Sequence, residues 1–246
     1  MQRLFIYSEN IDADRVTIRG EPLRKVRTVL RMGPNDRLAV FDDTGVEYLC
    51  RVVTLTVTEG VLEIIERKQA AAESSCRIHL GQALPKSDKM AYIIQKAVEL
   101  GVAAIHPFAS TRSIPRYDMR QTARRVERWQ KVALEAAQQS GRLTIPVVNA
   151  PVAFDEVLRV NLPPCLKIIL HHDGNTRKVK ALLREGVTKK PVFFLVGPEG
   201  GFTPQELALA EEHGFEVARL GPRTLRTDTA ALVLLSIIQY EFDEIR

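Results

Sequence analysis

The stretch VFFLVGPEGGFTPQE, residues 192–206, is the most informative part of the chain. Its first five residues show no polar alternation, which predicts a strand buried on both faces, as in a parallel sheet. The glycines that follow let the backbone take positive φ angles and come close to a ligand. Thr203 and Glu206 have the spacing of a capping box, with Pro204 at the first helical position. Open α/β sheets hold ligands at such strand–loop–helix junctions, so we expect a binding site here.

A second glycine loop, in LGPRTLRTDTA at 220–230, follows the next predicted strand. Either loop alone could be a structural turn, but two at the same sheet edge would build a pocket of backbone amides and carbonyls. Neither has the spacing of a phosphate-binding P-loop or of a dinucleotide fingerprint. Glu199 stands between the glycines, and Arg226 precedes a helix whose dipole disfavours a cation, so both are functional candidates. Thr227 is more simply explained as a helix cap.

Strands and helices alternate from Cys76 onward, which predicts a mostly parallel sheet covered by helices. The expected strands are 78–84, 102–108, 145–148, 166–170, 192–196 and 216–220. The expected helices are one capped by Ser87 and ended by Gly101, and four more at 119–140, 177–185, 204–213 and 228–242.

The first 70 residues have a different pattern. Short β-like segments separated by turn signals predict a small antiparallel barrel. The expected strands are 4–7, 37–41, 47–53 and 61–65, with one helix at 22–32. A small, polar segment at 69–75 is typical of a linker. We therefore expect two domains, residues 1–70 and 74–246.

Charge is concentrated in two parts of this 246-residue chain, whose net charge is +5. The first cluster is Arg15, Arg19, Arg24, Lys25, Arg27 and Arg31; the second is Arg112, Arg116, Arg120, Arg124, Arg125, Arg128 and Lys131. Either cluster alone is more simply explained as a solvated helix face. Two clusters on a basic chain favour a nucleic-acid partner.

The remaining sequence features indicate a cytoplasmic protein without a metal. The three cysteines, Cys50, Cys76 and Cys165, form no CxxC pair and suit reduced core thiols. No apolar run approaches the ~20 residues of a membrane span, and the N-terminus lacks a signal-peptide pattern. Adjacent His171 and His172 have no partner at ligand spacing, so we expect no metal and a place at a pocket rim or on the surface.

Four motifs give the chain a family resemblance: GPEGGF at 197–202, LGPRTLRTDTA at 220–230, QKAVELGV at 95–102 and EAAQQSGRLTIP at 135–146. Together with KVRTVLRMGPNDRLAVFDDTG near the N-terminus, they resemble the RsmE-type ribosomal RNA uridine-N3 methyltransferases of the SPOUT superfamily. The resemblance implies an N-terminal PUA-like β-barrel for RNA, a SPOUT α/β domain with a C-terminal trefoil knot, and a homodimer. The chain differs from the usual pattern at Arg24-Lys25, where the family has a His-rich pair, and at Asp228, where it has Glu.

The resemblance also implies a cofactor, a substrate and roles for particular residues. S-adenosylmethionine would lie between the two glycine loops and the end of the 166–170 strand. The implied cofactor-binding residues are Leu170, His171, Leu195, Val196, Gly197, Pro198, Gly200, Gly201, Leu220, Gly221, Leu225 and Thr227. Arg226 would stabilise a developing uracil anion and Glu199 would orient the base or nearby arginines.

The implied substrate is 16S ribosomal RNA, naked or in the assembled small subunit. Its expected contacts are Arg24, Lys25, Arg31, Arg112 and Arg142. Two alternatives stay open. One is a related enzyme acting on another RNA position or on a ribose 2′-hydroxyl; the other is a ribosome-assembly protein that binds RNA without catalysis.

Overall fold

The structure is a computed structural model that describes residues 1–69, 76–86, 88–113, 119–172, 176–186 and 191–242. Contacts divide the chain into two compact units. Unit 1 is Met1–Glu73 with Ala137–Ile145, and unit 2 is Ser74–Ala136 with Pro146–Arg246. The expected linker lies largely outside the described residues.

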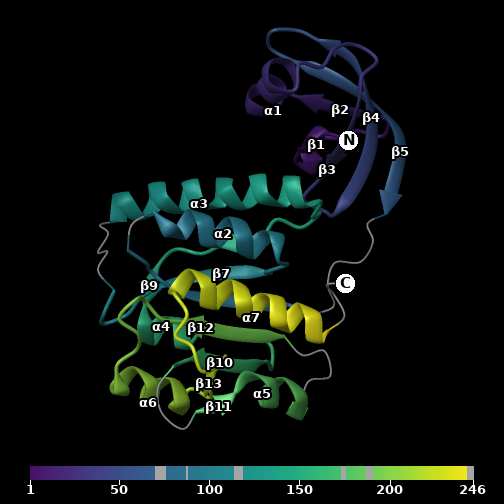
Figure 1. Cartoon of the computed structure of the whole chain (residues 1–246). Coiled ribbons are helices and arrows are strands. Elements are labelled where there is room, and N and C mark those ends of the chain that lie inside the picture. The colour runs from purple at the N-terminus through teal and green to yellow at the C-terminus, as the bar shows by residue number, and fades with distance from the viewer. Residues whose placement is uncertain (70–75, 87, 114–118, 173–175, 187–190, 243–246) are drawn as a thin grey trace. The chain divides into compact units, whose positions relative to one another are not determined.

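Unit 1 is built on a curled five-stranded sheet in the order β1-β3-β4-β5-β2 (Figure 1). The strands are β1 (Arg3–Phe5), β2 (Arg15–Ile18), β3 (Arg37–Phe41), β4 (Val46–Leu55) and β5 (Gly60–Gln69). All pairings are antiparallel except β1 with β3. Alternate residues point into one apolar core, which includes Val16, Leu38, Val40, Val52 and Leu62. This architecture agrees with the expected PUA-like unit.

The helical part of unit 1 is shorter than expected. Helix α1 (Gly20–Arg24) continues into one π-helical stretch, η2 (Lys25–Val29), whereas the sequence predicted a helix over 22–32. Arg31 then takes a φ angle of 52°, which ends the helical path. The prediction also missed β2, although its Val16 and Ile18 are buried on alternate positions.

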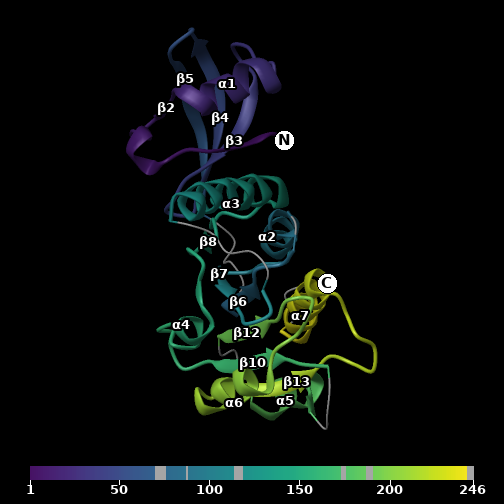
Figure 2. The same ribbon diagram turned by 90° about the vertical axis from the view of Figure 1, so that its left-hand side faces the viewer.

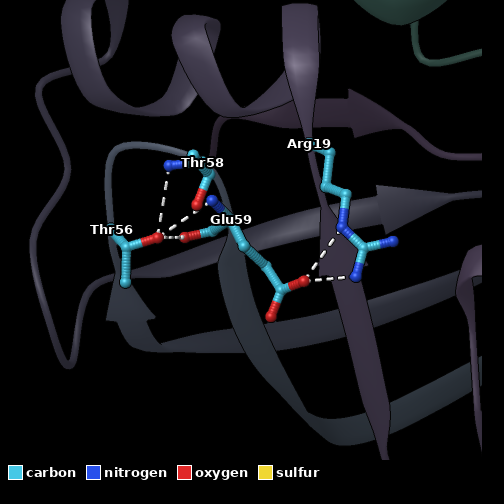
Figure 3. Close-up of polar contacts among 4 residues, drawn as sticks. All are labelled: Arg19, Thr56, Thr58 and Glu59. Carbon is cyan, nitrogen blue, oxygen red and sulfur yellow. Dashed lines mark hydrogen bonds and ion pairs between the residues drawn. The ribbon is translucent and has the colours of Figure 1, made fainter.

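The turn of the β4–β5 hairpin is closed by a hydroxyl group, and an ion pair joins it to the residue that follows β2 (Figure 3). Thr56 Oγ1 accepts hydrogen bonds from the backbone N–H of Thr58 (3.3 Å) and of Glu59 (2.9 Å), and donates one to the Glu59 carbonyl (2.7 Å). Arg19 donates through Nε to the Glu59 carboxylate at 2.9 Å. One arginine of the first basic cluster is therefore neutralised within the unit.

Unit 2 contains a parallel sheet in the order β11-β13-β10-β12-β6-β7-β8, with β9 also paired to β7. The strands are β6 (Ile78–Ala83), β7 (Ala104–Ala109), β8 (Val147–Val148), β9 (Val152–Ala153), β10 (Leu166–Leu170), β11 (Arg177–Lys178), β12 (Val192–Val196) and β13 (Glu216–Arg219). The strand opening the stretch 192–206 is thus the middle strand of the sheet, between β10 and β6. All five of its residues are buried, as their lack of polar alternation predicts.

Helices cover both faces of this sheet. The helices are α2 (Lys89–Glu99), α3 (Met119–Ser140), α4 (Phe154–Leu158), α5 (Val179–Gly186), α6 (Pro204–Glu212) and α7 (Thr227–Glu241); the end of α3, from Ala137, belongs to unit 1. Helices α2 and α7 pack together on one face, and α4 and α6 lie on the other (Figure 2). The core beneath α4 and α6 is aromatic, with Phe108, Phe193, Phe202 and Phe215.

The predicted elements of unit 2 agree with the structure apart from short ones. Three short elements were not expected from the sequence, namely β9, β11 and α4; residues 177–178, expected in a helix, form the strand β11. Each is five residues or fewer, too short to show a periodicity. Ser87, the expected cap of the helix ended by Gly101, lies outside the described residues. No helix among the described residues is both long and apolar enough to cross a membrane.

Two histidines are buried together in the sheet. His79 Nδ1 on β6 lies 3.1 Å from His106 Nε2 on β7, and the rings stack at 5.4 Å between centroids. Burial lowers the pKa of His106 to about 4, with a smaller contribution from His79. Burial, followed by the charge of Arg77, also lowers the pKa of His79. Both imidazoles are therefore neutral in the folded protein at neutral pH.

Candidate functional site

A cavity of about 260 Å³ opens at the carboxyl end of the parallel strands. It lies between the glycine loop (197–201), which follows β12, and the second loop (220–226), which follows β13; the end of β10 also lines it. Ligands of open α/β sheets bind at this edge, so the location agrees with the expected site.

The cavity gathers most of the residues that the sequence analysis selected. The expected residues that line it are Leu170, His171, Val196, Gly197, Pro198, Glu199, Gly201, Leu220, Gly221, Leu225, Arg226 and Thr227. Leu195 does not line it, because this residue is fully buried in the aromatic core below. Gly200 does not line it either; its carbonyl faces Arg112.

Six further lining residues were not selected from the sequence as binding residues: His172, Phe202, Arg219, Arg223, Thr224 and Ala230. Each lies within three positions of a selected residue along the chain, so the sequence around the selected positions was the signal to use.

The glycine loop is held by contacts on several sides. Gly201 has a φ angle of 68°, which a residue with a side chain rarely adopts, and its N–H donates to the Pro198 carbonyl at 2.9 Å. The predicted capping box is present, since Thr203 Oγ1 accepts from Glu206 N–H (3.2 Å) and the Glu206 carboxylate accepts from Thr203 N–H (2.8 Å). The path from β12 into α6 is therefore fixed locally.

Two neighbouring strand ends also hold the glycine loop. After β7, Thr111 N–H donates to the buried Glu206 carboxylate at 2.8 Å, and Arg112 Nη1 donates to the Gly200 carbonyl at 2.6 Å. After β6, Lys86 N–H donates to the Glu199 carboxylate at 3.2 Å. Glu199 thus has a structural contact in addition to its place at the cavity.

The second loop is more exposed. Gly221, Arg223 and Arg226 are exposed, and Arg226 occupies the N-cap position of α7 with extended backbone angles and no side-chain cap bond. Thr227, the first residue of α7, is buried, and its Oγ1 donates to the Gly197 carbonyl at 2.6 Å. The second loop is therefore tied to the rest of the site mainly through Thr227, the residue that follows it.

Charge at the cavity is mostly positive. Arg219, Arg223 and Arg226 line it, against one carboxylate, that of Glu199. Such a lining suits an anionic group or an electron-rich base that acquires negative charge. In the described part of the chain, no group of three His, Cys, Asp or Glu residues could hold a metal ion.

The residues selected for RNA lie in both units. In unit 1, Arg24 and Arg31 are exposed, Lys25 donates to Gln138 Oε1, and Arg142 is half-buried. In unit 2, Arg112 is exposed at the glycine loop. Arg116 of the second basic cluster lies outside the described residues, and Arg128 of that cluster pairs with Asp88 at 2.5 Å.

Comparisons with known proteins agree with this architecture. Residues 72–239 match the model of an RNA methyltransferase domain, and residues 26–65 match that of an RNA methyltransferase PUA domain. The ribosomal RNA small subunit methyltransferase E of Bacillus subtilis is 30% identical, over all of this chain and 99% of the relative. That of Synechocystis is 31% identical, over 96% of this chain and 76% of the relative.

Two solved structures are similar over nearly the full length. The small subunit methyltransferase E of Neisseria gonorrhoeae, bound to S-adenosyl methionine, is 34% identical with a TM-score of 0.87 over 98% of this chain and 97% of that one. A methyltransferase of Legionella pneumophila, in complex with the same cofactor, is 32% identical with a TM-score of 0.88 over 97% and 96%. The chain therefore belongs to the ribosomal RNA small subunit methyltransferase E family of RNA methyltransferases.

Proposed function

We propose that this protein transfers the methyl group of S-adenosylmethionine to N3 of a uridine in 16S ribosomal RNA. The observation that carries the proposal is the cavity between two glycine loops with Arg226 at its edge, in a chain similar along its whole length to small subunit methyltransferases E. The relatives from Neisseria and Legionella bind the same cofactor.

The residues around the cavity fit this cofactor. A Cβ at Gly221 would meet no protein atom within 4 Å, and its φ is not left-handed, so neither packing nor backbone strain requires glycine there. The missing side chain instead leaves room beside the cavity for a ligand. Apolar Leu170, Val196 and Leu225 suit an adenine ring, and the arginines suit a carboxylate.

Arg226 is the proposed catalytic residue. The cofactor supplies a methyl group already activated on a sulfonium, so the protein has to position the base and manage its charge. N3 of uridine is a protonated imide at neutral pH, and its loss of the proton leaves negative charge on the uracil ring. The exposed Arg226 guanidinium, held at the start of α7, can stabilise that charge.

Glu199 is proposed to orient the substrate side of the site. Its carboxylate lines the cavity and accepts the Lys86 N–H, so it links the glycine loop to the chain that follows β6. This hydrogen bond holds the Glu199 carboxylate in a cavity that is also lined by Arg219, Arg223 and Arg226. Leu170, His171, Val196, Gly197, Pro198, Gly201, Leu220, Gly221, Leu225 and Thr227 are proposed to contact the cofactor.

RNA affinity is proposed to come from the basic clusters. The exposed Arg24 and Arg31 of unit 1 are the strongest candidates for phosphate contacts. Arg112, at the glycine loop, and Arg142, within the motif 135–146, are the other candidates. Affinity from phosphate contacts weakens steeply as salt rises, because bound counterions are released. Lys25 has a hydrogen-bond partner in Gln138, which favours a smaller contribution.

We also propose a homodimer, a trefoil knot and a cytoplasmic location. Exposed Tyr92 on α2 and Tyr240 on α7, two helices that pack together, support an apolar interface with a second copy. The knot is supported by the path of the second loop: β13 and β12 lie on opposite sides of β10, yet Thr227 reaches the end of β12. The cytoplasmic location is proposed because the protein would meet its ribosomal RNA substrate there.

The test is methylation in vitro of 16S rRNA and of small ribosomal subunits, each incubated with methyl-labelled S-adenosylmethionine. Nucleoside mass spectrometry should find 3-methyluridine in at least one of the two substrates. Label in a 2′-O-methyl nucleoside or in another base would show a different specificity. Cofactor binding by calorimetry without methylation of either substrate would favour an RNA-binding protein without catalysis.

A further inference from the structure

A buried glutamine connects the two loops of the cavity. Gln82 lies near the end of β6, in register with Val196 of β12, and is fully buried. Its Nε2 donates to Thr227 Oγ1 at 2.9 Å, and Thr227 Oγ1 donates to the Gly197 carbonyl at 2.6 Å. The Gln82 amide therefore ties Thr227 to β6, and the Thr227 hydroxyl in turn ties the start of α7 to the start of the glycine loop.

The chemistry of the partners fixes the orientation of this amide. Nε2 also donates to the Ala83 carbonyl at 3.0 Å, which can only accept. The single hydroxyl hydrogen of Thr227 is directed to Gly197, so its oxygen has to accept from Gln82. Only the NH₂ group of Gln82 can face both partners.

The same orientation leaves a polar atom without a partner. Gln82 Oε1 is buried and has no hydrogen-bond partner among the described residues. An unpaired buried acceptor lowers stability, and an apolar side chain of similar size would avoid this cost. The stability of the fold therefore does not explain why a glutamine occupies this position. The hydrogen bond that Gln82 donates to Thr227 does explain it.

We propose that Gln82 is a positioning residue for the methyl transfer. By holding Thr227, it fixes the backbone of the adjacent Arg226 and the separation of the two loops. Gln82 does not itself line the cavity, so it acts through Thr227 rather than on the ligand. The inference rests on the proposed function and adds to it a residue from a third strand, 145 positions away in sequence from Thr227.

The first experiment compares Gln82→Leu with a matched control, Gln239→Leu. Gln239 is also buried, also donates one Nε2 bond to a carbonyl (Leu100, 3.0 Å), and also has an unpaired Oε1, but it lies at the other end of α7 from Arg226. Gln82→Leu should lower kcat on the order of 10- to 100-fold while the Tm changes little, because the loss of two donated hydrogen bonds is offset by the removal of the unpaired Oε1. Gln239→Leu should leave kcat within about twofold, since the hydrogen bond that it removes joins α7 to Leu100 and touches neither loop.

A second variant separates positioning from packing. Gln82→Glu keeps the size of the side chain, but its carboxylate cannot donate to Thr227, whereas the protonated acid can. The rate of Gln82→Glu relative to the unaltered protein should therefore rise as pH falls. A ratio that does not change with pH, together with unchanged turnover in Gln82→Leu, would overturn the proposal. Absence of methylation by the unaltered protein would instead contradict the proposed function.

Discussion

The two loops that form the cavity differ in how firmly the protein holds them. The glycine loop is fixed by Arg112, by Lys86 N–H and by the Thr203–Glu206 capping box. Between Leu220 and Arg226, by contrast, the described structure gives no side-chain hydrogen bond, and most of these residues are exposed. The first side-chain bond that the described residues make after this loop is that of Thr227, which is bonded to Gln82 of β6 and to the Gly197 carbonyl.

This difference suggests a division of labour. A loop that is already rigid loses little conformational entropy when it binds a ligand, so the glycine loop can act as the fixed side of the site. A loop with few contacts can close over the ligand, and here it also carries the candidate catalytic residue. The chemistry would thus depend on the second loop, which has few contacts, and the shape of the site on the firmly held glycine loop.

Arg226→Ala should have the largest effect on activity. Removing the charge that stabilises the uracil anion should lower kcat on the order of 10²–10³-fold. Because Arg226 makes no cap bond, the Tm should change little. The cofactor affinity should also change little, since Arg219 and Arg223 remain in the cavity lining. Single-turnover methylation measures the loss of catalytic rate, and calorimetry measures the Tm and the cofactor affinity.

Arg223→Ala is the control, since Arg223 lies in the same exposed loop and lines the same cavity. It removes the same charge three residues earlier and should have a smaller effect on kcat. Equal losses in both variants would show that the net charge of the loop matters, and not the position of Arg226.

Acid should lower the free energy of unfolding of the sheet that carries both loops, because two histidines are buried in its strands β6 and β7. Burial holds the pKa of His106 at about 4 and also lowers that of His79, whereas both are near 6.5 when unfolded. The unfolded chain therefore binds more protons between pH 6.5 and 4, and stability falls as pH decreases through that window. The loss from His106 is about 3 kcal/mol at most.

Urea unfolding at a series of pH values checks this expectation, with His106→Asn as the comparison. The variant cannot titrate in this range, so its stability should depend less steeply on pH between 6.5 and 4. A dependence as steep as that of the unaltered protein would show that other groups cause the acid loss.

The contrast between the loops also shows how far the sequence alone could go. Residues 192–206 predicted a buried strand, a glycine loop and a capped helix correctly, because each depends on neighbours in sequence. The cavity could be placed because parallel strands share a carboxyl edge. The sequence could not show which loop is held firmly, because the contacts that decide it come from other strands. They are made by Lys86 and Gln82 on or after β6 and by Arg112 after β7.

Gln82 illustrates the same limit. A glutamine inside the apolar strand 78–84 is the one sequence signal it offers, and its partner Thr227 is 145 positions away. Helix-cap logic selected Thr227 and gave it a local role. The structure gives that hydroxyl bonds to Gly197 and Gln82, contacts with two different strand ends that no local pattern contains.

One glycine in each loop allows a direct comparison of their roles. Gly201→Ala forces a residue with a side chain to a φ of 68°, which costs about 1–2 kcal/mol, although its Cβ would come no closer than 3.8 Å to His172. Gly221→Ala meets no protein atom, so its stability should stay within about 0.5 kcal/mol. The first change should lower the free energy of unfolding, and the second should lower cofactor affinity because its methyl group occupies ligand space. Denaturant unfolding measures the stability of both variants, and calorimetry measures their cofactor affinity. Lower stability in Gly221→Ala, or lower cofactor affinity in Gly201→Ala alone, would contradict these roles.

Arg112→Ala should have the smallest effect, and it asks whether the rigidity of the glycine loop matters for binding. The variant removes the 2.6 Å bond to the Gly200 carbonyl, an exposed contact worth about 1 kcal/mol, which corresponds to roughly fivefold in cofactor affinity. Arg128→Ala is the control, since it removes an equally exposed arginine whose partner, Asp88, is outside both loops. If the glycine loop is the fixed side of the site, Arg112→Ala should weaken cofactor binding and Arg128→Ala should not, while both weaken RNA binding by a similar amount. Equal cofactor affinity in the two variants would mean that the contacts left in place, the capping box and the Lys86 N–H bond to Glu199, are enough to keep the loop rigid.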